Sequence, residues 1–255
     1  MSEVTTPYAT GTPCWVDLMA ADQQAALDFY RDLFGWQGEA GPAEFGGYAV
    51  CELRGKAVAG IGPRMAPEAP VVWTGYLASD DAESTQQKIV AAGGTILAPV
   101  MDVGNLGRML IAADPQGAVF GVWQAGEFGG AQIVNEASAL TWNELHTSDV
   151  PAATAFYGAV FGAEVVPFEG ADSYWEFRVG GRAVGGVTLL ANDPPGTPAH
   201  WLTYFSVDDV DSTVDALVRS GGTVLAPPFD MIAGRMTVVA DPQGGIFAMI
   251  KPQPM

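Results

Sequence analysis

The chain has few basic residues for its size. Its 255 residues include three Lys, eight Arg and two His, against 29 Asp and Glu, which gives a formal net charge of −18. Such a surface repels phosphate backbones and anionic lipids, so we expect neither nucleic acid nor a membrane as a partner. A local Arg can reverse the field inside a cleft, which leaves room for an anionic substrate.

Cysteines and long apolar segments are also scarce. Cys14 and Cys51 are too few for a disulfide framework and predict two reduced, buried thiols. No apolar run approaches the ~18 residues of a membrane span. The opening MSEVTTPYATGTP lacks a basic region followed by an apolar run, so no signal peptide is expected. We expect a soluble cytoplasmic protein that is a monomer or a homodimer.

An internal repeat organises the chain. PCWVDLMAADQQAALDFYRDLFG (13–35) aligns with LTWNELHTSDVPAATAFYGAVFG (140–162), and GRMLIAADPQGAVFGVW (107–123) aligns with GRMTVVADPQGGIFAMI (234–250). Both offsets are 127, as in 142 − 15 for the paired Trp residues. The repeat predicts two homologous domains.

We place these domains at residues 11–125 and 138–252, with a polar, Gly-bearing linker at 126–137. Each domain divides again into two halves with one scheme. A strand ends at an Asp in the N-cap position of an amphipathic helix, and three short strands follow. The unit is therefore βαβββ, four times over, which predicts an α+β fold.

Three motifs carry a resemblance to a known family. They are Asp-x₆-Phe-Tyr-x₃-Phe-Gly at 22–35 and again at 149–162, VDDVDST at 207–213, and DPQG starting at Asp114 and Asp241. With them, nearly the whole chain resembles the vicinal-oxygen-chelate superfamily of glyoxalase I, extradiol dioxygenases and bleomycin-resistance proteins. It is most similar to tandem glyoxalase-like proteins of actinobacteria, among them mycobacterial antigens and polyketide-pathway proteins named as hydroxylases. The resemblance implies two cups, each a curved eight-stranded sheet.

The family's chemistry uses a divalent metal whose His and Glu ligands come from the first, fifth and last strands of a cup. Carried over residue by residue, those positions are Trp15, Thr74 and Gly121 in the first domain and Trp142, Leu202 and Ala248 in the second. None is a usual ligand. We therefore expect no cofactor. The alternative is a divalent metal at a displaced site made by Glu144, His146 and His200.

Residues two apart in a strand share a face, so Trp142, Glu144 and His146 are expected to line one wall of the second cup. Glu144 is the candidate acid or base, supported by His146 and His200, because a carboxyl beside Trp in an apolar cup is partly desolvated. The competing interpretation is that Glu144 is a carboxylate hydrogen-bonded to an Arg or to a backbone N–H. For both histidines, the alternative to a catalytic role is that they are hydrogen-bonded polar residues at the edge of the pocket.

Further residues are candidates for binding an organic ligand. They are Trp15, Asp17, Tyr76, Trp142 and Tyr204 on the expected cup walls, with Arg108 and Arg235 as clamps for an anionic or phenolate oxygen. For each Arg, a surface salt bridge is the alternative. Trp73 and Trp201 alternate away from the cups, so we expect them in the core.

These features support three functions. The first is a metal-free protein that binds a small, aromatic metabolite. The second is an enzyme of lyase, isomerase or hydroxylase type that uses Glu144 as a base. The third is a metal-dependent glyoxalase-type lyase or a dioxygenase with a displaced His/Glu site.

Overall fold

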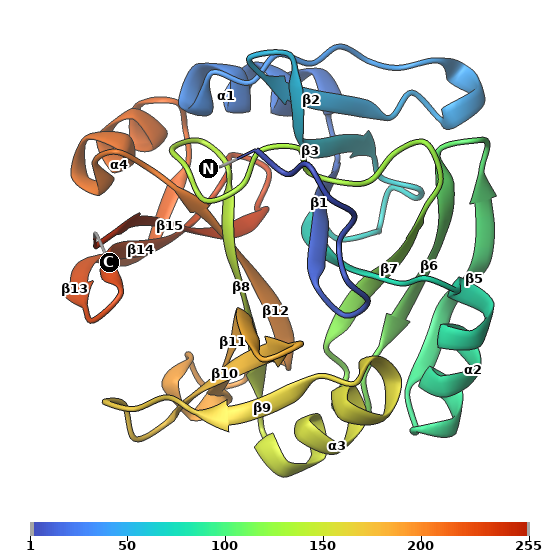
Figure 1. Ribbon diagram of the computed structural model, residues 1–255. Coiled ribbons are helices and arrows are strands. Elements are labelled where there is room, and N and C mark those ends of the chain that lie inside the picture. The colour runs from blue at the N-terminus through green and yellow to red at the C-terminus, as the bar shows by residue number, and fades with distance from the viewer. Residues whose placement is uncertain (1–2, 254–255) are drawn as a thin grey trace.

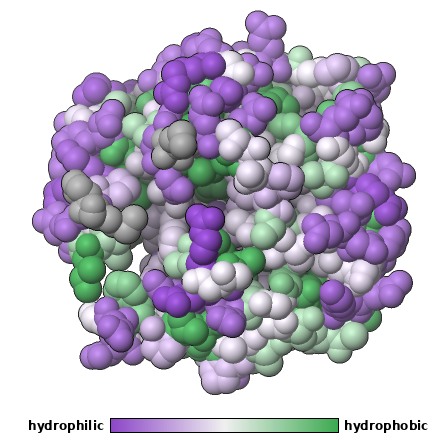
Figure 2. Space-filling model, viewed as in Figure 1, coloured by the Kyte–Doolittle hydropathy of each residue, from purple (hydrophilic) through white to green (hydrophobic). Residues whose placement is uncertain are grey.

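The computed structural model describes residues 3–253 of the chain. Two mixed β-sheets, one from each half of the sequence, stand side by side with helices packed between and around them (Figure 1). Among the helices of these residues, none has both the length and the apolar character to span a bilayer. Hydrophilic residues predominate around the periphery of the face seen in Figure 2, as the charge of −18 leads one to expect.

The first sheet contains seven strands. In spatial order they are β2 (Ala49–Leu53), β3 (Lys56–Pro63), β1 (Pro13–Ala20), β4 (Val72–Ala78), β7 (Val119–Ala125), β6 (Gly107–Ala113) and β5 (Thr95–Val103). β1 is parallel to β3 and β4 is parallel to β7, whereas the remaining neighbours are antiparallel. The two central strands β1 and β4 therefore come from the two βαβββ units of the same domain.

The second sheet repeats this order with one strand more. It runs β13 (Thr223–Met231), β14 (Gly234–Ala240), β15 (Ile246–Pro252), β12 (His200–Ser206), β8 (Leu140–Thr147), β11 (Arg182–Leu189), β10 (Tyr174–Val179) and β9 (Glu164–Pro167). The eight strands expected for each cup are thus present here, while the first sheet has seven. In the first domain the counterpart of β9 pairs only through a single bridge from Gln37 to Glu52. The following residues are rich in Gly and Pro, which favour turns, and form the short 3₁₀ helix η1 (Ala43–Phe45).

Four helices begin as the sequence predicts, at an aspartate. They are α1 (Gln23–Phe34), α2 (Ala82–Ala91), α3 (Val150–Phe161) and α4 (Val210–Arg219), and the N-cap residues are Asp22, Asp81, Asp149 and Asp209. Each carboxylate accepts a backbone N–H three residues along the chain, which satisfies one of the unpaired donors of the first turn. A second 3₁₀ helix, η2 (Leu190–Asn192), follows β11.

The two domains share their hydrophobic cores. α1 lies beside α4 and α2 lies beside α3, so each helix pair contains one helix from each domain (Figure 1). One core joins Tyr30 and Trp36 of the first domain to Phe205 and Phe247 of the second. The other contains Trp201, and the first core contains Trp73, as expected for residues that alternate away from the cups.

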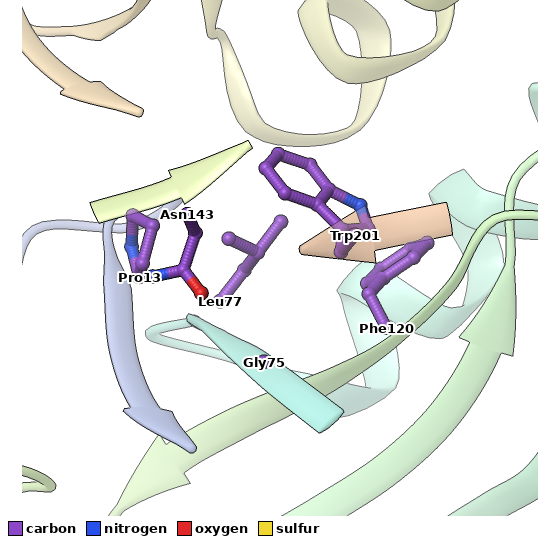
Figure 3. Close-up of a pocket in the computed structure, with 6 residues that line it drawn as sticks. All are labelled: Pro13, Gly75, Leu77, Phe120, Asn143 and Trp201. Carbon is purple, nitrogen blue, oxygen red and sulfur yellow. The ribbon is translucent and has the colours of Figure 1, made fainter. Parts of the chain in front are cut away.

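Packing at the centre of this joint is nearly complete. A cavity of about 10 Å³ remains between β4 and β12, with Gly75, Leu77, Asn143 and Trp201 among its lining residues (Figure 3). Such a volume holds at most about one water molecule. The cavity is therefore a small packing gap between the domains and has no room for an organic ligand.

Candidate functional site

The cup walls are the faces of the central strands that point away from the shared cores. In the second domain the directly opposed pairs on β8 and β12 are Trp142–Tyr204, Glu144–Leu202 and His146–His200. In the first domain β1 and β4 pair in the same register, and the opposed pairs are Trp15–Tyr76, Asp17–Thr74 and Met19–Val72. The two cups therefore share a Trp, an acid and a Tyr, but only the second has the histidines.

A hydrogen-bonded network surrounds Glu144 in the second cup. The Tyr204 hydroxyl donates to Oε1 of Glu144 at 2.9 Å, and Nε1 of Trp142 donates to the Tyr174 hydroxyl at 2.9 Å. Burial and then the charge of Glu144 raise the pKa of Tyr174 well above its usual range. Glu144 is buried, with 7% of its surface exposed. Its observed partners are therefore aromatic hydroxyls and His146, rather than an Arg.

The first cup contains the same network around Asp17. Tyr48 and Tyr76 donate to Oδ2 of Asp17 at 3.1 and 3.0 Å, and Nε1 of Trp15 donates to the Tyr48 hydroxyl at 2.8 Å. Oδ1 of Asp17 is buried and has no hydrogen-bond partner among the described residues. Burial, only partly offset by the two tyrosine hydrogen bonds, raises the pKa of Asp17 to about 7.

A glycine makes room for each network. A Cβ on Gly60 would lie 1.7 Å from the Tyr48 hydroxyl oxygen, and a Cβ on Gly186 would lie 1.9 Å from that of Tyr174. Any side chain at these positions would displace the tyrosine. The glycines on β3 and β11 are therefore part of the arrangement that holds the tyrosine beside the acid.

His146 extends the network of the second cup toward its edge. Its Nδ1 lies 2.7 Å from Oδ2 of Asp193, just after η2, and its ring stacks on that of His200 with centroids 4.4 Å apart. Nε2 of His146 lies 3.0 Å from Oε1 of Glu144 but out of line, so this contact is electrostatic and Nε2 has no hydrogen-bond partner within residues 3–253. Glu144, His146 and His200 thus lie together, as the strand pattern predicts, and Asp193 joins them.

The two histidines have opposite pKa shifts. Burial disfavours the charged form of His146, but the carboxylates of Glu144 and Asp193 outweigh it, so its pKa is raised. Burial, together with the neighbouring His146, lowers the pKa of His200. The neutral form of His200 is therefore favoured beside a His146 that binds its proton more tightly.

The two cups differ in how they are closed. In the first, Phe128 of the linker packs edge-on against Trp15 and Trp123, with ring centroids 4.9 and 6.0 Å away, and Trp15 is buried. In the second, Trp142 is half-buried, while the equivalent tyrosines Tyr48 and Tyr174 are half-buried in both cups. The Trp wall is therefore more accessible in the second cup.

Another cavity lies at the rim of the first domain. It measures about 550 Å³ and is lined by the N-terminal segment 4–8, the ends of β4 and β7, and the linker, with Tyr8 and Trp123 among the aromatic residues. Asp17 does not line it. This cavity is therefore separate from both acid networks.

Arg108 and Arg235 form surface ion pairs, which is the alternative weighed against a role as ligand clamps. Arg108 pairs with Glu83 and Asp102, and Arg235 pairs with Asp211 and Asp230, all at the surface. The reason is strand alternation. On β6 and β14 the cup-facing residues are Met109 and Met236, so the preceding Arg points to the helix-covered side.

Sequence reasoning omitted three residues of these networks. Tyr48 and Tyr174 align in the repeat, each 12 residues before Gly60 or Gly186, as in 60 − 48, and this shared spacing could have identified them. Asp193 lies in an irregular segment that the repeat does not constrain. Its position beside His146 follows only from the path of the chain after η2.

With the fold and the two networks defined, comparison with known proteins identifies the family. The model of the Glyoxalase/Bleomycin resistance protein/Dioxygenase superfamily matches the chain twice, at residues 13–122 and 139–249. The chain belongs to this superfamily. The predicted resemblance and the tandem α+β fold are thereby confirmed.

Two curated members of the superfamily align over nearly their full length. "Putative glyoxylase CFP32" of Mycobacterium tuberculosis is 44% identical over 255 residues, covering 97% of both chains. "Anthracycline biosynthesis protein DnrV" of Streptomyces peucetius is 35% identical over 264 residues, covering 96% of this chain and 95% of that protein.

Solved superfamily structures share the fold. The Mn(II)-bound glyoxalase from Novosphingobium aromaticivorans has a TM-score of 0.66 at 18% identity, covering 95% of this chain and 82% of its own. The 2,3-dioxygenase LapB from Pseudomonas sp. KL28 also has a TM-score of 0.66, at 13% identity, covering 97% and 94%.

The superfamily's usual metal positions do not suit an ion in this chain. In the first cup, a Cβ on Gly121 would lie 2.2 Å from the Tyr76 ring, which therefore fills the space of a ligating side chain. In the second, Ala248 is opposed to Tyr204 in the same register. Trp142 and Leu202 supply no ligand atom suited to these metals. The residues with ligating atoms lie elsewhere, around His146, Asp193 and His200.

Proposed function

We propose that the second domain binds a small, flat aromatic molecule that carries a hydroxyl or carbonyl group, and that the first domain is mainly structural. The observation that supports this most strongly is Glu144, a buried acid on the same strand face as the half-buried ring of Trp142. Apolar pockets with a few placed polar groups bind such ligands well. The first cup has an equivalent acid, but Phe128 packs over its Trp wall.

Each wall of the second cup has a distinct role in this proposal. Trp142 and Tyr174 offer ring surface for stacking against a planar ligand. Glu144 accepts a hydrogen bond from a ligand hydroxyl, or takes its proton if the bound molecule reacts, with His146 alongside. The anthracycline pathway in the name of the relative DnrV supports a polyketide-type aromatic as the ligand class.

The repeat provides a matched control for the test. We would titrate an anthracycline and its aglycone into the protein by calorimetry, in a buffer containing EDTA. Glu144→Gln should weaken binding tenfold or more, since a hydrogen bond to a charged group contributes about 1.5–3 kcal/mol. Asp17→Asn, the same change in the first cup, should leave the affinity unchanged.

Two results would contradict the proposal. One is that the folded wild-type protein binds neither compound. The other is that both substitutions weaken binding equally, since the site would then not be specific to the second cup. Loss of binding in Asp17→Asn alone would move the site to the first domain.

A further inference from the structure

Three residues at the edge of the second cup form a group with the composition of a metal site. His146, Asp193 and His200 each offer one ligating atom, and these atoms lie within 4.8 Å of one another. We propose that they bind a divalent transition-metal ion through Nδ1 of His146, a carboxylate oxygen of Asp193 and Nε2 of His200. This site is separate from the superfamily's positions at Trp142, Leu202 and Ala248.

The ring nitrogens of His200 are already distinguished by a hydrogen bond. Its Nδ1 lies 2.9 Å from the carbonyl oxygen of Pro198, which can only accept, so Nδ1 carries the proton. Nε2 of the neutral ring therefore has a free lone pair. A backbone carbonyl that fixes the tautomer of a histidine in this way is the usual support of a metal ligand.

His146 has a complementary arrangement. Its Nδ1 is 2.7 Å from Oδ2 of Asp193, close to the spacing of two neighbouring ligands, and an ion can replace the proton that they share. Its buried Nε2 lies 3.0 Å from Oε1 of Glu144 without an in-line hydrogen bond. When Nδ1 binds an ion, a small rotation of the ring aligns Nε2–H with Glu144, which then acts as the supporting carboxylate.

Access and ligand chemistry fit a transition metal. The side chain of Asp193 is 16% exposed and His200 is half-buried, so an ion can enter from solvent. Two imidazoles and one carboxylate suit Zn²⁺, Co²⁺, Ni²⁺ or Fe²⁺, whereas Mg²⁺ and Ca²⁺ prefer oxygen ligands. In a tetrahedral site with bonds of about 2.1 Å, neighbouring ligand atoms lie about 3.4 Å apart. Binding therefore widens the 2.7 Å contact between His146 and Asp193 and adjusts the remaining distances between ligand atoms, which are within 4.8 Å.

The site is specific to the second domain. Met19 and Val72 occupy the positions of His146 and His200 in the equivalent register of the first sheet. The repeat therefore predicts one ion per chain, even though both domains share the acid, the Trp and the tyrosines.

The test uses the full-length protein without an affinity tag, stripped with a chelator and titrated with Co²⁺. We expect one equivalent to bind and to produce visible d–d absorption bands. The chain has only two histidines, so both imidazole NMR signals should shift or broaden at the same stoichiometry. His146→Ala, His200→Ala and Asp193→Asn should each weaken binding at least tenfold, while the exposed Asp215→Asn should bind as wild type.

Several outcomes would overturn the site. These are no binding at one equivalent, binding that leaves both imidazole signals unchanged, or equal binding by the His200→Ala variant, which would indicate adventitious ions on the acidic surface. Because His200 is half-buried, that variant remains informative if His146→Ala does not fold. The readout uses no organic ligand, so it can fail while the aromatic-binding proposal succeeds, and the reverse.

Discussion

The hydroxyl of Tyr30 in the first domain donates a hydrogen bond to Oδ2 of Asp241 in the second, at 2.9 Å. Tyr157 and Asp114 form the reciprocal contact at 3.2 Å. The Tyr of the Phe-Tyr motif thus binds the Asp of the DPQG motif in the other domain. Two of the three motifs by which the family is recognised therefore join the two domains and take no part in either acid network.

The first prediction concerns this joint. Tyr30→Phe should lower the free energy of unfolding by about 2 kcal/mol, because it removes the hydroxyl that donates to Oδ2 of buried Asp241 and accepts from Nε1 of Trp73. Urea denaturation measures the change, and Tyr157→Phe is the matched variant of the second contact. If neither variant is destabilised, the interdomain hydrogen bonds contribute nothing net to stability.

The glutamines of the DPQG turns extend the same joint. Nε2 of Gln243 donates to the backbone oxygen of Asp22 at 2.8 Å, and Nε2 of Gln116 donates to that of Asp149 at 3.0 Å. DPQG forms a turn, and its partners in the other domain could not be read from the sequence. Local motifs fix the turn, whereas the contact depends on how the two domains pack.

Strand alternation made part of the candidate site predictable, because it decides which side chains of a strand face the cup. Alternation and the repeat place Glu144, His146 and His200 on one wall, and the antiparallel pairing of β8 with β12 brings the histidines together. The same rule, applied to β6 and β14, would have excluded Arg108 and Arg235 from the cups. Asp193 could not be predicted, because it lies in an irregular segment that has no periodic pattern. The packing of Phe128 over the first cup could not be predicted either, because it depends on the path of the linker.

The second prediction concerns pH and Asp17. Its pKa of about 7 in the folded protein exceeds the value of about 3.9 for an unfolded chain. The favourable contribution of the protonated form is therefore complete below about pH 4 and is lost as the pH rises to about 7. Relative to Asp17→Asn, which does not titrate, the wild type should lose up to about 4 kcal/mol of unfolding free energy across this window.

Chemical denaturation of both proteins between pH 5 and pH 8 covers most of the window and avoids precipitation near the pI of about 4.1. The stability difference between them should grow in favour of Asp17→Asn as the pH rises from 5 to about 7 and then level off. A difference that stays constant with pH would mean that the two tyrosine hydrogen bonds keep Asp17 ionised.

The third prediction concerns the arginines. Arg108→Ala and Arg235→Ala should each change the free energy of unfolding by no more than about 1 kcal/mol, because their ion pairs are at the surface and screened by salt. Neither should alter the affinity for an aromatic ligand. Calorimetric titration of Arg235→Ala is the decisive measurement, since a large loss of affinity would return this residue to the binding site.

The fourth prediction tests how tightly the Glu144 network is packed. Gly186→Ala places a methyl group 1.9 Å from the position of the Tyr174 hydroxyl oxygen, so the tyrosine must move away from Trp142. We expect a loss of about 1–3 kcal/mol in unfolding free energy. Tyr174→Phe in the same chain removes the clashing oxygen and should recover part of that loss, giving a double-mutant cycle with a coupling energy above about 0.5 kcal/mol.

Gly60→Ala with Tyr48→Phe is the matched cycle in the first cup, where the Cβ would lie 1.7 Å from the hydroxyl oxygen. Only the cycle in the second domain should also change the affinity for an aromatic ligand, because only that cup is proposed to bind one. Additive stability effects in both cycles would show that the glycines are required for some reason other than space for the tyrosines.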